Sequence, residues 1–358
     1  MLNSLNVSSE IFSYPSFVGY SLLNNGKLRP LVPDFSEAVC KSFLNPSVII
    51  DDGRIIVNIR AVNYLTYHSV GLKRFAHDAR PIKYPVIDPD ANFKTENFLC
   101  LLNDDLQIIA FSRCEMLRGE TEPQGYYHGL EDARLVRWND RLYLIGARLD
   151  RAAENDGERN FQNNNSRMEY SEIEIDSNGF YAKEVSNKRI LVPSEVPGMW
   201  SLEKNWVPVM DRPHYFIKWH NPCEIVHVDP VTGKSRVAHL GNFREGLGLP
   251  RGGSQLVPWG EGYLSIVHDS NHHKSYLGHH DTFYLHRFII WDSELNICHW
   301  SKPFSFMNID IEFCAGLATN GDQVLITFGG GDSSSFVLQI SQQALSEFLF
   351  THRDWRSM

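Results

Sequence analysis

The feature that most constrains the fold of this chain is a β-hairpin signal that occurs five times along it. Each signal consists of a short β-favouring run, a turn rich in Asp, Asn or Gly, and a second β-favouring run. The first runs cover residues 47–50, 134–137, 206–209, 255–258 and 316–319, and their partners cover 55–59, 142–145, 215–219, 263–267 and 324–328. Further strand-like runs lie at 97–102, 107–112, 169–175, 224–228 and 283–291.

Hairpins that recur along the whole chain, each followed by more strand, are typical of a radial repeat. We therefore predict an all-β fold, a five-bladed β-propeller. A two-sheet sandwich with five similar hairpins is the alternative. The predicted divisions are an irregular N-terminal arm over residues 1–44 that packs on the propeller, the propeller itself over 45–340, and a short C-terminal helix over 341–358 that Ser341 caps.

The composition is that of a soluble globular protein, with 42% hydrophobic and 22% charged residues in a chain of 358. A net charge of −9 without any run of Lys or Arg argues against a nucleic-acid partner. No apolar run approaches membrane-spanning length and no signal peptide is recognisable, so we expect a cytoplasmic protein without a membrane partner. The six cysteines form no CxxC pair, which excludes a zinc framework and disfavours a disulfide scaffold.

Polar residues precede the first strand of every hairpin and follow its second strand. These two ends lie side by side in an antiparallel hairpin, so blades arranged around one axis would bring them to a single mouth. The residues expected there are the acids Glu131, Asp132, Glu203, Glu312 and Asp332, and the bases Arg60, Arg148, Lys204, Arg251 and His268. The strand ends also carry Asn45, Asn63, Asn205 and Asp269.

A mouth that mixes acids and bases suits glycosyl transfer, which needs a proton for the leaving oxygen and a nucleophile at the anomeric carbon. Asp132 is the best candidate for the acid, because the like charge of Glu131 should raise the apparent pKa of the pair. A second carboxylate would activate water, and Glu203 and Glu245 are the candidates. Alternatively, Arg148 and Lys204 would hold phosphate as the attacking group.

Two polar stretches, residues 150–167 and 268–286, are predicted to be long loops. The second contains six histidines, among them His272, His273, His279 and His280. Catalytic zinc sites combine three fixed ligands with supporting contacts, which paired histidines in a flexible loop seldom provide. We therefore expect no metal there and favour a lid that closes over a sugar.

Four motifs in consistent order resemble glycoside hydrolase family 130, the five-bladed propeller enzymes that act on β-mannosides. The family's Gly-x-Glu-Asp-Pro-Arg stretch is similar to Gly129-Leu130-Glu131-Asp132-Ala133-Arg134. Its Glu-Lys-Asn-Trp is matched at 203–206, its strand ending in His at 262–268, and its closing Gly-x-x-Asp at 329–332. The likeness spans roughly residues 45–340, and it implies a β-propeller enzyme of carbohydrate metabolism.

The resemblance implies that Asp132 is the proton donor and acts through a sugar hydroxyl in an inverting reaction. It implies that Lys204 and an arginine at Arg148 bind phosphate, and that Arg60 and Asp332 contact the sugar. Two departures leave phosphate dependence open. Ala133 replaces the family's usual proline, and the run 148–151 contains two arginines, either of which could take the phosphate position.

The predicted site combines these inferences. It comprises Asp132, Glu131 and Glu203 for catalysis; Arg148, Lys204, Arg151 and His268 for phosphate; and Arg60, Asn63, Asn45, Asn205, Arg251, Asp269, Glu312 and Asp332 for the substrate. No cofactor is expected, but inorganic phosphate is a candidate co-substrate and a small oligosaccharide such as β-1,2-mannobiose the expected partner. A homo-oligomer stays open.

Three classes of function follow from this site. The first is an inverting phosphorylase or hydrolase acting on β-mannosides. The second is a β-mannosyltransferase of the related propeller family. The third is a non-catalytic sugar-binding propeller, which would need neither the acid motif nor the basic pair.

Overall fold

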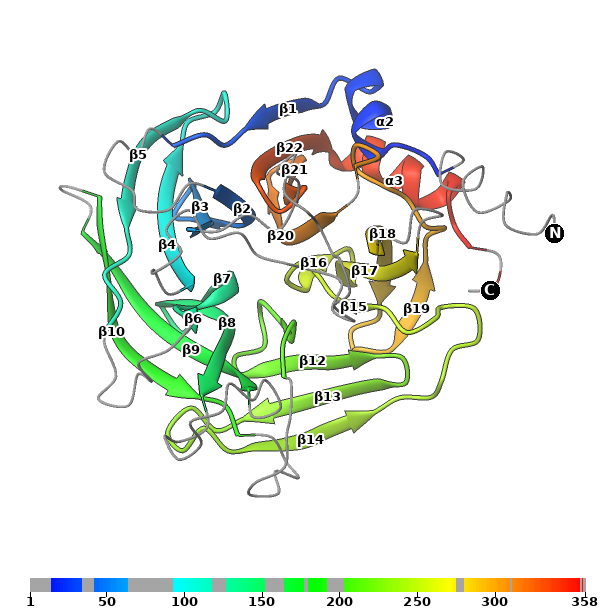
Figure 1. The fold of residues 1–358 in the computed structure, drawn as a ribbon. Helices are drawn as coiled ribbons and strands as arrows, with labels where there is room; N and C mark the ends of the chain where they lie inside the picture. The colour runs from blue at the N-terminus through cyan, green and yellow to red at the C-terminus, as the bar shows by residue number, and fades with distance from the viewer. Residues whose placement is uncertain are drawn as a thin grey trace.

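The computed structural model describes residues 14–33, 42–63, 93–117, 127–151, 164–176, 180–191, 203–274, 280–309, 311–354 and 356. These residues form five separate antiparallel sheets that are arranged around one axis (Figure 1). The prediction of a five-bladed β-propeller is therefore confirmed. All five predicted hairpins are present, within residues 42–62, 131–151, 207–220, 257–274 and 312–330.

The first two blades come from the N-terminal half of the chain. Blade 1 consists of β2 (Ser42–Asp51), β3 (Arg54–Val62), β4 (Phe93–Leu102) and β5 (Ile108–Arg113), with the short β6 (Tyr127–His128) parallel to β4. Blade 2 consists of β7 (Glu131–Trp138), β8 (Arg141–Arg151), β9 (Asn164–Asp176) and β10 (Tyr181–Arg189). In each of these two blades the strand that is first in sequence lies innermost, at the axis (Figure 1).

The next two blades continue the same order around the ring. Blade 3 consists of β11 (Val207–Pro208), β12 (Tyr215–His220), β13 (Cys223–Val228) and β14 (Ser235–Leu240). Blade 4 consists of β15 (Arg251–Gly252), β16 (Val257–Trp259), β17 (Gly262–Lys274), β18 (His280–Trp291) and β19 (Ile297–Trp300), with both β15 and β16 paired to β17.

Blade 5 joins the two ends of the chain. It consists of β20 (Glu312–Asn320), β21 (Gln323–Gly330), β22 (Ser334–Ser341) and, as its outer strand, β1 (Lys27–Pro30). β1 pairs with β22 in the register Lys27 to Gln339, so backbone hydrogen bonds close the ring. The described part of the arm that was expected to be irregular therefore contains a strand, and it also contains the helix α2 (Phe17–Leu23).

The predicted C-terminal helix is α3 (Gln342–Thr351), and Ser341 caps it by accepting a hydrogen bond from the Ala344 amide at 3.1 Å. α3 packs against α2, where the rings of Phe17 and Phe348 lie 4.8 Å apart and Tyr20 donates to the Ala344 carbonyl. Both helices cover the apolar cluster between blades 4 and 5. In the described part of the chain, neither helix is long and apolar enough to cross a membrane.

Buried polar side chains hold the inner strands together at the axis. Gln255 donates to the carbonyls of Val48 and Leu135 at 3.1 and 2.8 Å, and its own oxygen accepts from the Leu317 amide at 3.1 Å. One fully buried side chain thereby bridges blades 1, 2, 4 and 5. Apolar clusters between neighbouring blades supply the rest of the core.

The prediction of two long loops is wrong in part, because strands extend into both stretches. β17 and β18 pair without interruption as far as Lys274 with His280, so residues 268–274 and 280–286 are strand. β8 and β9 likewise pair as far as Arg151 with Asn164. His279 lies outside the described residues, as do the side chains of His272, His273 and His280, so the predicted lid rests on sequence alone.

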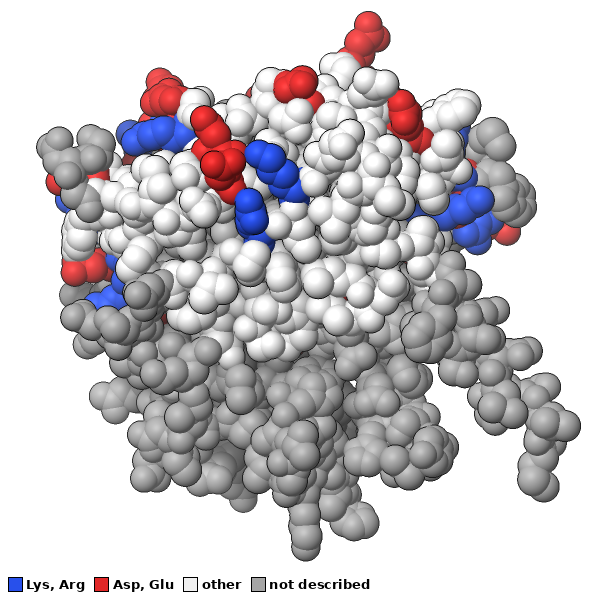
Figure 2. Space-filling model, turned by 90° about the horizontal axis from the view of Figure 1, so that it is seen from above, with Lys and Arg blue, Asp and Glu red and all other residues white. Residues whose placement is uncertain are grey.

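Charged side chains of both signs lie next to each other on the described surface seen in Figure 2, where Lys and Arg neighbour Asp and Glu along the upper part of the view. A broad uncharged band lies below them.

Candidate active site

The inner strands carry irregularities at their mouth ends, and these set the direction of the site residues. The pairing register shifts between Leu44 and Ser47 in β2, and between Glu131 and Arg134 in β7. At these bulges Asn45 and Asp132 have positive φ angles of 48° and 47°. A bulge re-aims a side chain that a regular strand would direct elsewhere. The two bulges therefore turn Asn45 and Asp132 toward each other.

Asp132 is held by two donors from blade 1. Arg60 donates through Nη1 and Asn45 through Nδ2, both to Oδ1 of Asp132 and both at 2.8 Å. Arg60 also lies 3.3 Å from the Glu131 carboxylate through Nη2. The Asp132 side chain is 19% exposed and the Arg60 side chain 7%. Both donors bond Oδ1, so within the described residues Oδ2 is the oxygen that remains available to a ligand.

The surroundings of Asp132 stabilise its ionised form. Burial acts to raise the pKa of Asp132, but Arg60, the hydrogen bond from Asn45 and the nearby Arg134 outweigh burial and lower the pKa to about 2. The expectation that Glu131 raises the pKa of Asp132 is therefore wrong. The physical reason is that the Arg60 guanidinium lies between the two carboxylates and pairs with both of them.

Arg134 is a buried link between three blades. Its guanidinium donates to the Asp132 carbonyl at 2.6 Å, to the Asn205 side chain at 3.3 Å and to the Gly253 carbonyl at 2.8 Å. Only 1% of the residue is exposed. Burial lowers the pKa of Arg134 to about 10, so the group is still a cation at neutral pH.

A second group of residues makes the mouth electropositive on the side of blades 3 and 4. Lys204 and Arg251 are exposed, and among the described residues neither has an acidic partner. Arg251 pairs with His268 across β15 and β17. His268 is buried and stacks on Tyr284 at 4.9 Å, and its Nδ1 lacks a hydrogen-bond partner in the described structure.

The electrostatic surroundings of His268 include these cations. Burial holds the pKa of His268 well below its usual value, and the neighbouring His286 and the cations Arg134, Arg251 and Lys204 act in the same direction. His268 is therefore neutral. A neutral imidazole beside cations without acidic partners is an arrangement that can accept an anion.

Two of the predicted catalytic and phosphate residues are already engaged elsewhere. Arg148 contacts the carboxylate of Glu169 through Nε and Nη2, each at 3.0 Å. Glu203 accepts a hydrogen bond from the Trp206 indole at 2.9 Å and lies 3.8 Å from the Lys218 ammonium. The side chain of Arg151 lies outside the described residues.

Glu312 differs most from its prediction as a substrate residue. Its fully buried carboxylate accepts hydrogen bonds from the backbone amides of Phe306, Met307 and Ile309 at 2.5, 2.6 and 3.2 Å. Burial raises the pKa of Glu312 although these amides act against it. The carboxylate therefore holds the 306–309 turn in place, and this correction removes it from the set of sugar contacts.

The remaining predicted substrate residues have mixed surroundings. Asn63 accepts from the Lys94 amide at 2.8 Å, and Asp269 accepts from Arg287 at 3.1 Å. Asn205 and Asp332 have positive φ angles of 60° and 49° at the mouth ends of blades 3 and 5. The structure thus brings together an acid cluster of Asp132, Glu131, Arg60 and Asn45, and an electropositive cluster of Lys204, Arg251 and His268.

Arg134 lies within the motif at residues 129–134, but its role in the site was not predicted from the sequence. Its acceptors are mostly backbone carbonyls, at Gly252 and Gly253 far along the chain. Because every residue has a backbone carbonyl, a residue pattern cannot show which carbonyls accept these hydrogen bonds. The one available signal was an arginine placed inside an apolar inner strand, where a guanidinium needs buried partners.

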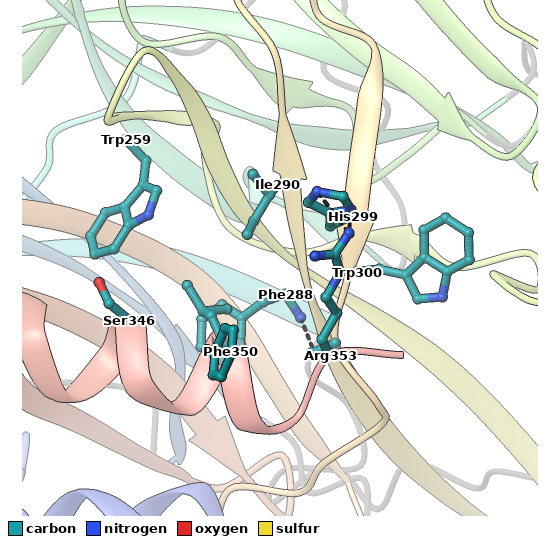
Figure 3. Close-up of a pocket in the computed structure, with 10 residues that line it drawn as sticks. Trp259, Phe288, Ile290, His299, Trp300, Ser346, Phe350 and Arg353 are labelled. Carbon is teal, nitrogen blue, oxygen red and sulfur yellow. Dashed lines mark hydrogen bonds between the residues drawn. The ribbon is translucent and has the colours of Figure 1, made fainter. Parts of the chain in front are cut away.

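A separate cavity of about 210 Å³ lies between α3 and blade 4, away from both clusters. Trp259, Phe288 and Phe350 line it, and at one end the Arg353 guanidinium lies beside the His299 ring (Figure 3). None of the predicted site residues lines it.

The fold matches solved structures of known class at low sequence identity. A structure from work on the GH130 family of mannoside phosphorylases, describing glycoside hydrolases that target β-1,2-mannosidic linkages in Candida mannan, has a TM-score of 0.54 at 11% identity and covers 92% of this chain and 93% of its own. A putative glycosidase from Bacteroides thetaiotaomicron has a TM-score of 0.53 at 11% identity, covering 92% and 96%. A glycosyl hydrolase from Bacteroides ovatus has a TM-score of 0.51 at 12% identity, covering 92% and 93%.

No family model matches the chain, and no curated protein sequence matches it. The structural match is thus to the GH130 fold over almost the whole chain, at a sequence distance where fold is what the likeness establishes.

Proposed function

We propose that this protein cleaves and forms β-mannosidic bonds, with inorganic phosphate as the attacking group and Asp132 as the proton-transferring carboxylate. The single observation that carries the proposal is the pairing of the two clusters at one mouth. In one cluster, hydrogen-bond donors from blade 1 hold the Asp132 carboxylate. In the other, Lys204 and Arg251 have no acidic partner among the described residues. The substrate class comes from the motif resemblance and the GH130-like fold.

Asp132 transfers the proton between the enzyme and the oxygen that leaves or attacks. In the free protein Asp132 is a carboxylate, so it can accept a proton from the hydroxyl of an incoming sugar without prior change. In the cleavage direction Asp132 first takes up a proton from solvent and delivers it to the leaving oxygen, while the attacking hydrogenphosphate releases one proton to solvent. The resting ionisation of Asp132 therefore favours bond formation from mannose 1-phosphate, the direction in which this residue acts as a base.

Phosphate is favoured over water as the attacking group for two reasons. Lys204, Arg251 and the neutral His268 offer cationic and hydrogen-bonding groups that match a phosphate. Hydrolysis needs a carboxylate to activate water. Of the two candidates, Glu203 is engaged by Trp206 and Lys218, and Glu245 is exposed. Arg251 takes the place that sequence reasoning gave to Arg148, because Arg148 is neutralised by Glu169.

Transfer from a sugar donor to a hydroxyl acceptor is the second candidate. The ionised Asp132 favours it, since an acceptor hydroxyl needs a base. The phosphorylase and the transferase differ in their donor. The first uses mannose 1-phosphate in the direction of synthesis, and the second uses a nucleotide sugar.

The test uses the full chain with β-1,2-mannobiose, with and without inorganic phosphate, and follows mannose 1-phosphate and free mannose. The expected result is mannose 1-phosphate that forms only with phosphate. A reverse assay supplies mannose with mannose 1-phosphate or with a nucleotide-activated mannose. Equal release of free mannose without phosphate would overturn phosphorolysis, and synthesis from the nucleotide donor alone would favour the transferase.

A further inference from the structure

The buried guanidinium of Arg134 contacts Asp132 and the residues that directly follow Lys204 and Arg251. On β7 it donates to the backbone carbonyl of Asp132 at 2.6 Å. On blade 3 it donates to the side chain of Asn205, which follows Lys204 directly. On blade 4 it donates to the carbonyls of Gly252 and Gly253 at 3.4 and 2.8 Å, and Gly252 follows Arg251 directly.

These contacts fix backbone that has little freedom of its own. Asp132 and Asn205 both have left-handed φ angles, which cost free energy unless the surroundings maintain them. Gly252 packs so closely on the Asn205 carbonyl that an added Cβ would lie 2.0 Å from it. The Asn205 and Gly252 segments therefore meet with almost no space between them, and Arg134 hydrogen-bonds both of them and Asp132.

Solvent has almost no access to Arg134 and its hydrogen bonds. The residue is 1% exposed, and its guanidinium lies 5.3 Å from the centre of the Phe313 ring. A planar guanidinium with five donors can bond several acceptors in fixed directions, whereas a lysine ammonium is one point with three donors. The single nitrogen of a lysine therefore cannot reproduce the directions of the contacts that Arg134 makes through three nitrogens.

We propose that Arg134 is a positioning residue that fixes the carboxylate of Asp132 relative to the Lys204 and Arg251 pair. It touches neither substrate nor phosphate, and it acts by holding the Asp132 carbonyl, Asn205 and the Gly252–Gly253 backbone in one rigid junction. The inference rests on the proposed function, because it gives that junction the task of setting the distance between the proton-transferring group and the phosphate.

The main test is Arg134→Lys, which keeps a positive charge but loses the planar fork. We expect kcat for phosphorolysis to fall at least ~100-fold, the size of effect that misplacement by about 1 Å produces. The KM for β-mannoside should change less than about threefold, because the sugar contacts are on other side chains. Calorimetric binding of inorganic phosphate should weaken about tenfold or more, since Lys204 and Arg251 lose their fixed separation.

A matched control separates positioning from stability. Val136→Ala, on the same strand, truncates a fully buried apolar side chain in the core between blades 2 and 3. It should lower the unfolding temperature and leave kcat per folded molecule at the wild-type level. A second variant, Asn205→Gly, keeps Arg134 but removes one of its acceptors. Glycine can adopt the positive φ angle of this position. This variant should lower kcat about tenfold even if Arg134→Lys does not fold.

The outcomes are distinct. Wild-type kcat and phosphate affinity in folded Arg134→Lys, or in Asn205→Gly, overturn the positioning role. An equal loss of kcat in Val136→Ala overturns it as well, since the effect would then follow stability. A wild-type protein that neither binds phosphate nor cleaves β-mannosides overturns the proposed function, and the role of Arg134 with it.

Discussion

Nη1 of Arg60 lies 2.8 Å from Oδ1 of Asp132, and this contact between blades 1 and 2 decides the charge of the carboxylate. Both side chains are largely buried, so each would be costly to leave unpaired. Asn45 donates to the same oxygen. The ion pair thus holds Asp132 in one orientation and in its ionised state.

Replacing Asp132 by Asn should remove the proton transfer proposed for this carboxylate and preserve the local geometry. The amide oxygen of the substituted side chain can still accept from Arg60 and Asn45, so the bulge should persist. We expect the rate of β-mannoside phosphorolysis to fall by about 10²- to 10⁴-fold, the usual contribution of a positioned acid or base. The assay is mannose 1-phosphate release at saturating substrate. Asp140→Asn, in the exposed turn at the other end of β7, is the control and should retain full activity. An active Asp132→Asn protein would exclude Asp132 as the acid.

The low pKa of Asp132 also predicts how stability depends on pH. Its pKa is lowered from 3.8 to about 2, a shift that corresponds to about 2 kcal/mol of folding free energy. That contribution is fully present above the unfolded value near 3.8, and it is lost as the pH falls from there to about 2. Urea denaturation between about pH 2 and pH 6 should therefore show a weaker acid dependence in Asp132→Asn than in the wild type. Identical pH profiles would mean that Arg60 does not stabilise the carboxylate.

The fold was predictable from the sequence because its signals are local. Each hairpin carries its own turn residues, such as Asp52 and Gly53 or Asn320 and Gly321, and the alternation of such units fixes the blade count. The outer strand of blade 5 was not predictable. β1 pairs with β22 across almost the full length of the chain, and four residues of mixed polarity give no local sign of that partner.

The site was predictable in its location and only partly in its chemistry. Antiparallel hairpins arranged around one axis bring Arg60 of blade 1 and Asp132 of blade 2 to one mouth. The ionisation of Asp132 depends on which charge lies nearest in space, and sequence neighbours suggested Glu131 where the fold supplies Arg60. Arg148 shows the same limit, because its partner Glu169 lies on the adjacent strand β9 and a pattern of residues cannot show that contact.

Removing the positive charge of Lys204 or Arg251 should affect phosphate specifically. We expect Lys204→Met and Arg251→Met each to raise the KM for phosphate by about 10- to 100-fold, the loss of one charge-assisted hydrogen bond worth roughly 1.5–3 kcal/mol. The KM for β-mannoside should change little. Steady-state kinetics with each substrate varied in turn separates the two. Lys302→Met, an exposed lysine just after β19, is the charge-matched control. If all three variants raise the KM for phosphate equally, the effect is one of net charge and not of a site.

Glu312 provides a test of the corrected assignment. Its carboxylate accepts from three backbone amides of the 306–309 turn, and in Glu312→Gln the neutral amide group accepts these hydrogen bonds less strongly. The stability should fall by about 2–4 kcal/mol, seen as a lower midpoint in urea denaturation. The kcat per folded molecule should stay within about twofold of wild type, because Glu312 contacts the turn and not the sugar. Glu347→Gln, on the exposed face of α3, is the control and should change the stability by less than about 0.5 kcal/mol. A Glu312→Gln protein of unchanged stability and much weaker sugar binding would restore Glu312 to the substrate site.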